Sequence, residues 1–264
     1  MKISFLLFLS MFFLSLPLFA EDPPKPKTVD TTVATDVDLT KNHFEMETRV
    51  GGIISTGNTS SISLSGSNST KYRVKHFENT WQAGAFYNRI HSTTGSATVG
   101  TAARYIFGTY RLDYYFLPLT TVFVGGGGYT DQIKGIGTAA QAFTGVKHYF
   151  IRNEKIEFGG SVGYNFTFED RLSPNANQEI HSASQRLLFK YAFNDHVELS
   201  QKVDTKENVQ NGRDFRLDSD TEIKVALVKH LSFVTGFKLR FDNQPVTGFK
   251  KLDTITNLSL AISF

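Results

Sequence analysis

Three features that define other protein classes are absent from this chain or scarce in it. The 264 residues include no cysteine, which excludes a disulfide-stabilised scaffold even in a compartment that permits disulfides. No apolar run after residue 20 reaches the length of about 20 residues that a membrane-spanning helix needs, which excludes an α-helical membrane protein. The formal net charge is only +3, without a concentrated basic stripe, so nothing indicates a nucleic-acid partner.

What the chain does contain is typical of a β-rich protein. It has 21 glycines, and aromatic residues make up 13% of it, which suits many strands joined by turns. The strands of a membrane-spanning β-barrel are only half apolar, so this composition remains compatible with such a barrel.

The N-terminal residues have the pattern of an export signal. Lys2 supplies the positive start, an apolar run follows, and the small Ala20 ends the segment. We therefore expect residues 1–20 to be a cleaved signal peptide. Residues 21–42 are polar and contain prolines, so they cannot bury a core and are expected to form a disordered periplasmic linker. One domain, residues 43–264, remains.

The last stretch of the chain alternates between two kinds of side chain. Because side chains of a strand alternate between its faces, one face is apolar: Leu258, Leu260, Ile262 and Phe264. The other face is small or polar: Asn257, Ser259, Ala261 and Ser263. Such a terminal strand fits a wall between lipid and a wet lumen, and it equally fits a half-buried strand of a soluble sandwich.

Alternation of this kind recurs about twelve times between residues 43 and 264, while helical spacing is not sustained. Short turns alternate with longer polar loops, as in outer-membrane barrels with both termini in the periplasm. We therefore predict an all-β fold, a transmembrane antiparallel up-and-down β-barrel of about twelve strands, with 10 or 14 as alternatives. Longer loops are expected at residues 91–97, 169–181, 206–213 and 242–251.

Charged residues gather on one face of the predicted strands between residues 196 and 242. We expect this face to line the lumen as a charge cluster: Glu198, Lys202, Asp204, Arg216, Asp218, Asp220, Glu222, Lys224, Lys238 and Arg240. Both signs are interleaved, so neighbours on adjacent strands can pair. The pattern leaves two interpretations open, a salt-bridged plug and the polar lining of a small pore. A ring of one sign would indicate ion selectivity, and mixed signs do not.

Other motifs point to no catalytic residue, cofactor or metal site. Gly125–Gly128 is followed by strand character rather than by a helix, so we expect wall glycines instead of a phosphate cradle. The seven histidines are scattered without metal-ligand spacing. A Gly-x-Ser-x-Gly elbow is absent from the sequence, but a hydrolytic triad is spatial, so a barrel hydrolase acting on lipid or peptide stays an alternative.

Several short motifs, taken in order, resemble one known family. They are Val50–Thr59 with its Gly-Asn-Thr turn, Arg111–Phe116 followed by Val124–Tyr129 and Asp131, and Phe158–Tyr164 followed by Glu169. This order is similar to that of the salt-induced outer-membrane protein family of the YdiY type, over about residues 43–264. The resemblance implies an outer-membrane β-barrel without a defined mechanism, and it carries over no catalytic residues.

The sequence as a whole favours a non-enzymatic barrel in the outer membrane of a Gram-negative bacterium. Its expected role is structural, in envelope stress, or that of a narrow passive channel. The alternatives are the barrel hydrolase and a soluble periplasmic β-sandwich that binds a ligand. The expected partners are outer-membrane lipid and, as barrel class implies, the assembly machinery that would recognise the terminal strand. The oligomeric state is left open.

Overall fold

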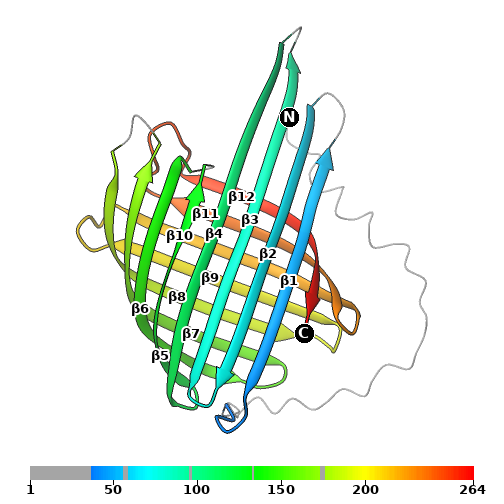
Figure 1. The fold of residues 1–264 in the computed structure, drawn as a ribbon, viewed down its shortest axis with the longest axis vertical. Helices are drawn as coiled ribbons and strands as arrows, with labels where there is room; N and C mark the ends of the chain where they lie inside the picture. Colours follow the sequence, from blue (N-terminus) through cyan, green and yellow to red (C-terminus); the bar gives the residue numbers. More distant parts are fainter. Residues whose placement is uncertain (1–36, 56–58, 95–96, 133, 173–175) are drawn as a thin grey trace. The chain divides into compact units, whose positions relative to one another are not determined.

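Residues 43–263 form a closed barrel of twelve antiparallel strands (Figure 1), in which each strand pairs with the next and β12 pairs with β1. The computed structural model describes residues 37–55, 59–94, 97–132, 134–172 and 176–264. The predicted signal peptide, most of the predicted linker and the Gly57–Asn58 turn lie outside the described residues. The strands are β1 His43–Ser55, β2 Thr59–Val74, β3 Phe77–Thr94, β4 Ala97–Leu117, β5 Thr120–Asp131, β6 Ile136–Arg152, β7 Ile156–Arg171, β8 Gln178–Ala192, β9 Val197–Asn208, β10 Phe215–Val228, β11 Leu231–Asp242 and β12 Leu252–Ser263.

The closed barrel confirms the predicted all-β fold and the count of twelve strands. It rules out the soluble β-sandwich, because a single sheet closes on itself and leaves no edge strand. None of the described residues forms a helix long and apolar enough to cross a membrane.

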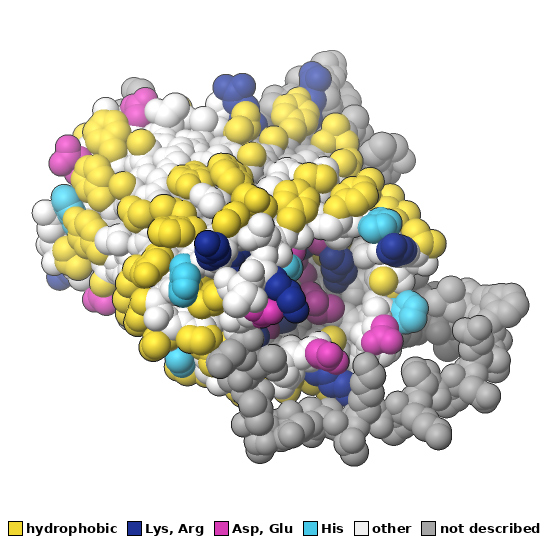
Figure 2. Space-filling model, turned by 60° about the horizontal axis from the view of Figure 1, so that its bottom comes forward, with side chains coloured by type: hydrophobic (Ala, Val, Ile, Leu, Met, Phe, Trp, Pro, Cys, Tyr) yellow, Lys and Arg dark blue, Asp and Glu magenta, His cyan; other side chains and the backbone are white. Residues whose placement is uncertain are grey.

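The two faces of the barrel wall differ sharply in polarity. On β10, Ile223 points outward and is 42% exposed, while its neighbours Glu222 and Lys224 line an internal cavity. The same alternation leaves aliphatic or aromatic side chains exposed on the outer face of every strand except β9, as the apolar surface in Figure 2 illustrates. An apolar outer band around a polar interior is the arrangement that a hydrocarbon environment selects.

Aromatic rings gather on the outer face at the barrel end where β1 begins and β12 ends, here called the terminus end. Phe77 and Tyr114 lie 5.2 Å apart between ring centroids, and Tyr191 and Phe193 lie 5.0 Å apart. The rings of Phe150 and Phe158 also meet there, with centroids 5.4 Å apart. A girdle of amphipathic and aromatic rings is typical of the boundary between lipid and water.

Inward glycines on the β3–β7 wall seat aromatic rings from the adjacent strand. A Cβ atom on Gly125 would lie 2.5 Å from the ring of its register partner Phe143, and one on Gly145 would lie 2.7 Å from the ring of its partner Phe123. The rings therefore lie flat against the wall rather than across the lumen. The space that these rings need explains the glycines of β5, which the sequence predicted to be wall glycines rather than a phosphate cradle.

Three predicted loops are much shorter than expected, because the strands continue into them. β3 extends to Thr94 and β4 begins at Ala97, so residues 91–97 are mostly strand. Likewise β7 runs to Arg171, β8 starts at Gln178, and β9 runs to Asn208. These segments are polar on both faces, so hydrophobic alternation could not reveal them, although the pairing of backbone groups continues.

The barrel closes where β1 meets β12. Register partners run from Glu47 with Ser263 to Gly51 with Ser259. Beyond them, Met46 and Phe264 exchange backbone hydrogen bonds, each with an N···O distance of 2.9 Å. Asp38 lies just before β1, and its carbonyl oxygen accepts from the Arg73 guanidinium of β2 over 2.9 Å. Both ends of the barrel domain therefore lie at the terminus end.

Candidate functional site

Two internal cavities lie along the barrel axis between the walls. The larger has a volume of about 780 Å³ and includes residues near the terminus end such as Glu45 and Ser263. The smaller, of about 340 Å³, lies toward the opposite, far end along β1 to β4. Both cavities are lined by the same five charged residues, which we call the mid-lumen layer: Arg49, Lys202, Asp204, Asp220 and Glu222.

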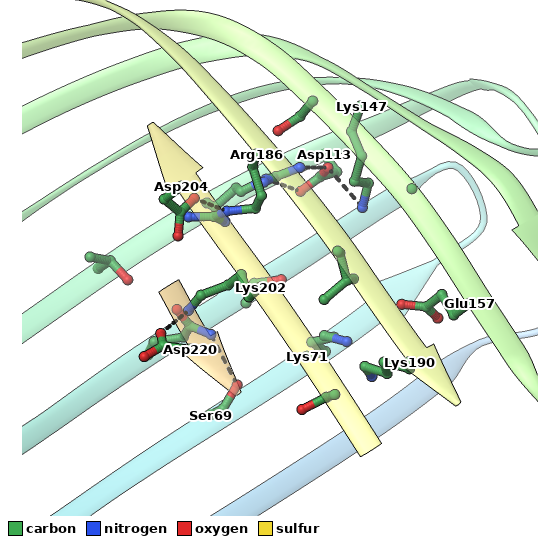
Figure 3. A pocket seen from close by; sticks show the side chains of 18 of the residues that line it. Ser69, Lys71, Asp113, Lys147, Glu157, Arg186, Lys190, Lys202, Asp204 and Asp220 are labelled. Atoms are coloured by element: carbon green, nitrogen blue, oxygen red, sulfur yellow. Dashed lines mark hydrogen bonds and ion pairs between the residues drawn. The ribbon is translucent and has the colours of Figure 1, made fainter. Parts of the chain in front are cut away.

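The mid-lumen layer is held together by ion pairs between neighbouring and distant strands. Asp220 accepts from Lys202 over 3.1 Å and from Lys238 over 3.2 Å, one on each adjacent strand. Asp204 pairs with Arg186 of β8, as Figure 3 shows together with the Lys202–Asp220 contact. These contacts link β8, β9, β10 and β11 into one charged wall.

One ion pair of this layer reaches over two strands. Arg49 on β1 donates to both carboxylate oxygens of Glu222 on β10, each at 2.8 Å. The two strands between them, β11 and β12, carry the small inward residues Gly236, Ser259 and Ala261 beneath the pair. Beside it, Lys224 pairs with Glu47, which also accepts from Arg49 over 2.6 Å. This bridge narrows the lumen between the two cavities.

The far end of the lumen holds a second set of buried ion pairs. The Glu169 side chain is fully buried and accepts from Arg216, from Arg171 over 2.9 Å, and from the Tyr129 hydroxyl over 3.1 Å. Arg240 on β11 reaches the buried Asp131 at the end of β5 over 2.9 Å. Because these pairs join strands that are not neighbours, they close much of the lumen cross-section at this end.

A third cluster surrounds Asp113 near the terminus end. Its carboxylate accepts from Arg111, from the Thr121 hydroxyl over 2.9 Å and from Lys147 of β6 over 3.4 Å. Figure 3 shows the contact between Lys147 and Asp113 along the cavity wall. Lys147 thus neutralises an acid two strands away.

The charges that line the larger cavity balance. Nine are acidic: Glu45, Glu47, Glu78, Asp113, Glu157, Glu198, Asp204, Asp220 and Glu222. Nine are basic: Arg49, Lys71, Arg111, Lys147, Arg186, Lys190, Lys202, Lys206 and Lys224. Among the described residues, only Glu198, Lys190 and Lys206 of this set lack an ion-pair partner at contact distance.

The structure places every residue of the predicted charge cluster on the inner face of β9, β10 or β11. Six line the larger cavity: Glu198, Lys202, Asp204, Asp220, Glu222 and Lys224. Asp218, Lys238 and Arg240 line the smaller one, and Arg216 pairs with Glu169 at the far end.

The partners that these residues reach across the lumen were not predicted from the sequence. Glu47 and Arg49 alternate with apolar residues on the first strand, so the same pattern could have included them. Glu169 and Asp131 fall at strand ends, where alternation gives no signal. Alternation assigns a face but not the opposing strand, so pairs such as Arg49–Glu222 could not be predicted.

The apolar residues of the terminal strand lie on the outer face. Leu258, Leu260, Ile262 and Phe264 are all exposed there, and the Phe264 ring stacks on His230 with centroids 5.0 Å apart. Their inward neighbours Ser259 and Ala261 are buried.

Comparison with protein families gives one match. A family described as a protein of unknown function, DUF481, matches residues 48–264. The chain belongs to this family. The match runs from within β1 to the end of β12, so it includes nearly the whole barrel. The salt-induced name that the motifs indicated is not part of this match and stays a prediction. Comparison with curated protein sequences finds no match.

Solved structures of similar fold are outer-membrane channels and porins. The COG4313 outer membrane channel from Pseudomonas putida F1 is 14% identical, with 92% of this chain and 100% of that chain covered and a TM-score of 0.48. The NanC porin is 11% identical, with 83% and 97% covered and a TM-score of 0.47. The closed twelve-strand barrel itself is established by the strand pairing of this chain.

Neither a metal centre nor a hydrolytic site emerges in the part of the chain that the structure describes. No group of three or more His, Asp or Glu side chains is arranged there to hold a metal ion. His43 contacts the Glu45 carboxylate over 2.8 Å. The other ring hydrogen bonds of the described histidines go to tyrosine and threonine hydroxyls and backbone oxygens, for example Thr120 with His148 over 2.8 Å, and none goes to a serine hydroxyl. The hydrolase alternative therefore has no geometric support in these residues.

Proposed function

We propose that this protein is a narrow passive channel of the outer membrane for small polar solutes. The observation that carries the proposal is the cavity of about 780 Å³ inside a closed barrel, lined by equal numbers of acidic and basic side chains. A barrel with only a structural role would gain more from an apolar or tightly packed interior, because buried ion pairs stabilise poorly compared with hydrophobic packing.

The mid-lumen layer gives this channel its expected properties. The Arg49–Glu222 bridge lies between the two cavities, so we expect it to limit passage from one cavity to the other. The lining charges cancel, so we expect a small conductance with weak preference between cations and anions. Small uncharged or zwitterionic solutes fit this lining better than bulky ions of one sign.

The proposal includes the location and the assembly route. Export through a cleaved signal peptide would deliver the chain to the periplasm, and the apolar outer face would then contact outer-membrane lipid. The assembly machinery would recognise the outward residues of β12 that end in Phe264. With twelve strands, the terminus end would face the periplasm and the far end the exterior.

The test is reconstitution into planar bilayers with a lumen-widening variant. We expect discrete small conductance steps from the wild type, and larger steps from Arg49→Ser/Glu222→Ser, because both partners of the bridge are removed without changing net charge. Lys71→Ser/Glu45→Ser is the matched control, since that pair joins adjacent strands at 3.2 Å and does not span the lumen. Its steps should equal those of the wild type.

Silence of both the wild type and the widened variant at high protein load would reject the channel and leave the structural role. Labelling of one serine by a serine-reactive probe, with release of fatty acid from phospholipid, would instead favour the hydrolase.

A further inference from the structure

Two cations of the larger cavity, Lys190 and Lys206, have no ion pair at contact distance among the described residues, and only Lys206 also lacks an acidic register partner. Lys206 on β9 has Ser184 and Arg216 as its register partners, neither of them acidic. The two nearest acids on that wall are engaged elsewhere, Asp204 with Arg186 and Asp218 with Arg240 over 3.2 Å. The only hydrogen bond of Lys206 among the described residues runs to the Gln141 side-chain oxygen of β6 over 3.4 Å.

A side-chain amide whose N–H groups have no acceptor among the described residues lies beside this lysine. The Gln141 oxygen also accepts from Asn165 over 3.4 Å, and the Asn165 oxygen accepts from Thr167 over 2.6 Å. These contacts use the side-chain oxygens and leave the Gln141 amide N–H groups without a partner among the described residues. A cluster that presents N–H groups and no free acceptor matches a ligand rich in oxygen acceptors.

Arg186 extends this group of donors on the neighbouring strand. Its register partner is Asp204, so it lies diagonal to Lys206, at roughly 7–8 Å between Cα atoms in such a pair. Only its Nε atom contacts Asp204, and its side chain is 46% exposed toward the cavity. The terminal nitrogens are therefore available for a carboxylate, which guanidinium groups bind through two parallel hydrogen bonds.

An aromatic face completes the site. Phe143 is the next inward residue after Gln141 on β6, and its ring lies flat over Gly125. The ring leaves space in the lumen and offers an apolar surface beside the donors. Ligand sites commonly combine such a surface with a few convergent polar groups.

We propose that Lys206, Arg186, Gln141 and Asn165 form a binding site inside the lumen for a small hydroxylated carboxylate. The carboxylate lies between Arg186 and Lys206, the hydroxyl oxygens accept from the Gln141 and Asn165 amides, and the carbon skeleton lies against Phe143. This inference deepens the proposed channel by naming its solute class, and it rests on that proposal for its physiological meaning.

The test measures binding at equilibrium, apart from conduction. Gluconate is titrated into the folded protein in detergent by calorimetry, with sorbitol as the uncharged analogue and inorganic phosphate as an anion without a carbon skeleton. We expect saturable gluconate binding, weaker phosphate binding and no detectable sorbitol binding. Lys206→Gln should weaken gluconate binding by about tenfold or more, because a charge-assisted hydrogen bond is lost.

Lys190→Gln is the matched control. Lys190 lies on the same wall and also lacks a contact ion pair, but its register partner is Glu157 and it is remote from Gln141. Gluconate binding should be unchanged in this variant. Gln141→Leu provides a second disruption, and should weaken gluconate binding several-fold without altering a charge.

Three outcomes would overturn the inferred binding site. Equal binding by the wild type and Lys206→Gln, the same loss in Lys190→Gln, or phosphate bound more tightly than gluconate would reject the site. Gluconate binding by a protein that is silent in bilayers would reject the channel and retain the site. Conduction without gluconate binding would reject the site and retain the channel.

Discussion

The two walls of the lumen, β4 to β6 and β9 to β11, differ in the side chains that they turn inward. On β4 to β6, several inward positions carry rings or glycines, and the Phe123 and Phe143 rings lie flat over Gly145 and Gly125. On β9 to β11, the inward positions are mostly charged, and long side chains reach over neighbouring strands, as Arg216 does toward Glu169. The first wall leaves the lumen free, and the second wall fills it.

The difference shows which side chains determine the size of the passage and which determine its charge. Aromatic rings that pack over glycines are held by contact with the backbone, so these positions tolerate little change in side-chain volume. Charged side chains are fixed by their partners, so the loss of one partner leaves the other uncompensated. Substitutions on the two walls should therefore fail in different ways.

The largest effect is expected at the far end of the charged wall. Arg216→Met leaves the fully buried Glu169 with Arg171 as its remaining cation. Removing one partner of a buried pair costs about 3–5 kcal/mol, so the unfolding midpoint in urea should fall steeply. Arg216→Met/Glu169→Gln should recover part of the loss, since the Glu169 carboxylate is removed while Asp214 and Asp242 still lack Arg216. A single variant as stable as the wild type would contradict this role.

A smaller loss is expected on the ring and glycine wall. A Cβ atom on Gly127 would lie 2.2 Å from the Gly108 carbonyl oxygen, so Gly127→Ala must shift backbone. Overpacking of this kind costs about 1–3 kcal/mol. Gly108→Ala is the control on the outer face, where an added Cβ meets nothing within 4 Å. The heat-dependent shift of gel mobility should separate the two variants, and equal midpoints would count against the packing described here.

The walls should also differ in their effect on ion preference. Lys202→Gln/Lys238→Gln leaves Asp220 without its two cations, so the reversal potential in a salt gradient should shift toward cation preference. Phe107→Leu on the other wall should leave the reversal potential unchanged while altering conductance. Because both lysines are partly exposed, the loss of stability should stay within about 1 kcal/mol. A shifted reversal potential in the Phe107 variant alone would contradict the assignment of ion preference to the charged wall.

A small effect on stability is expected at the closing seam. Phe264→Ala removes the ring that stacks on His230 but keeps the backbone bonds with Met46. Such a stack contributes about 0.5–1.5 kcal/mol. The folded amount in the membrane should fall more than the stability does, if the assembly machinery recognises this residue. Wild-type amounts of folded protein would remove that partner from the proposal.

The sequence predicted the barrel better than it predicted the lumen contacts. Alternation over Phe215–Val228, interrupted on its apolar face by Ser219 and Thr221, was enough to assign Glu222 inward and Ile223 outward, because the side-chain period of a strand is two. It could not place Arg49 opposite Glu222, since that contact depends on closure of the sheet. Strand ends such as Glu169–Arg171 were mistaken for loop, because polar residues stand on both faces there.

The central claim is that the charged face of the wall meets water inside the barrel while the apolar face meets lipid. The chain has no cysteine, so single cysteines can be introduced along β9 and tested with a polar, membrane-impermeant thiol reagent in reconstituted vesicles. The account predicts rapid reaction at Ser200→Cys and Lys202→Cys, and protection at Leu199→Cys and Val203→Cys. Reaction at the second pair with protection of the first would contradict it.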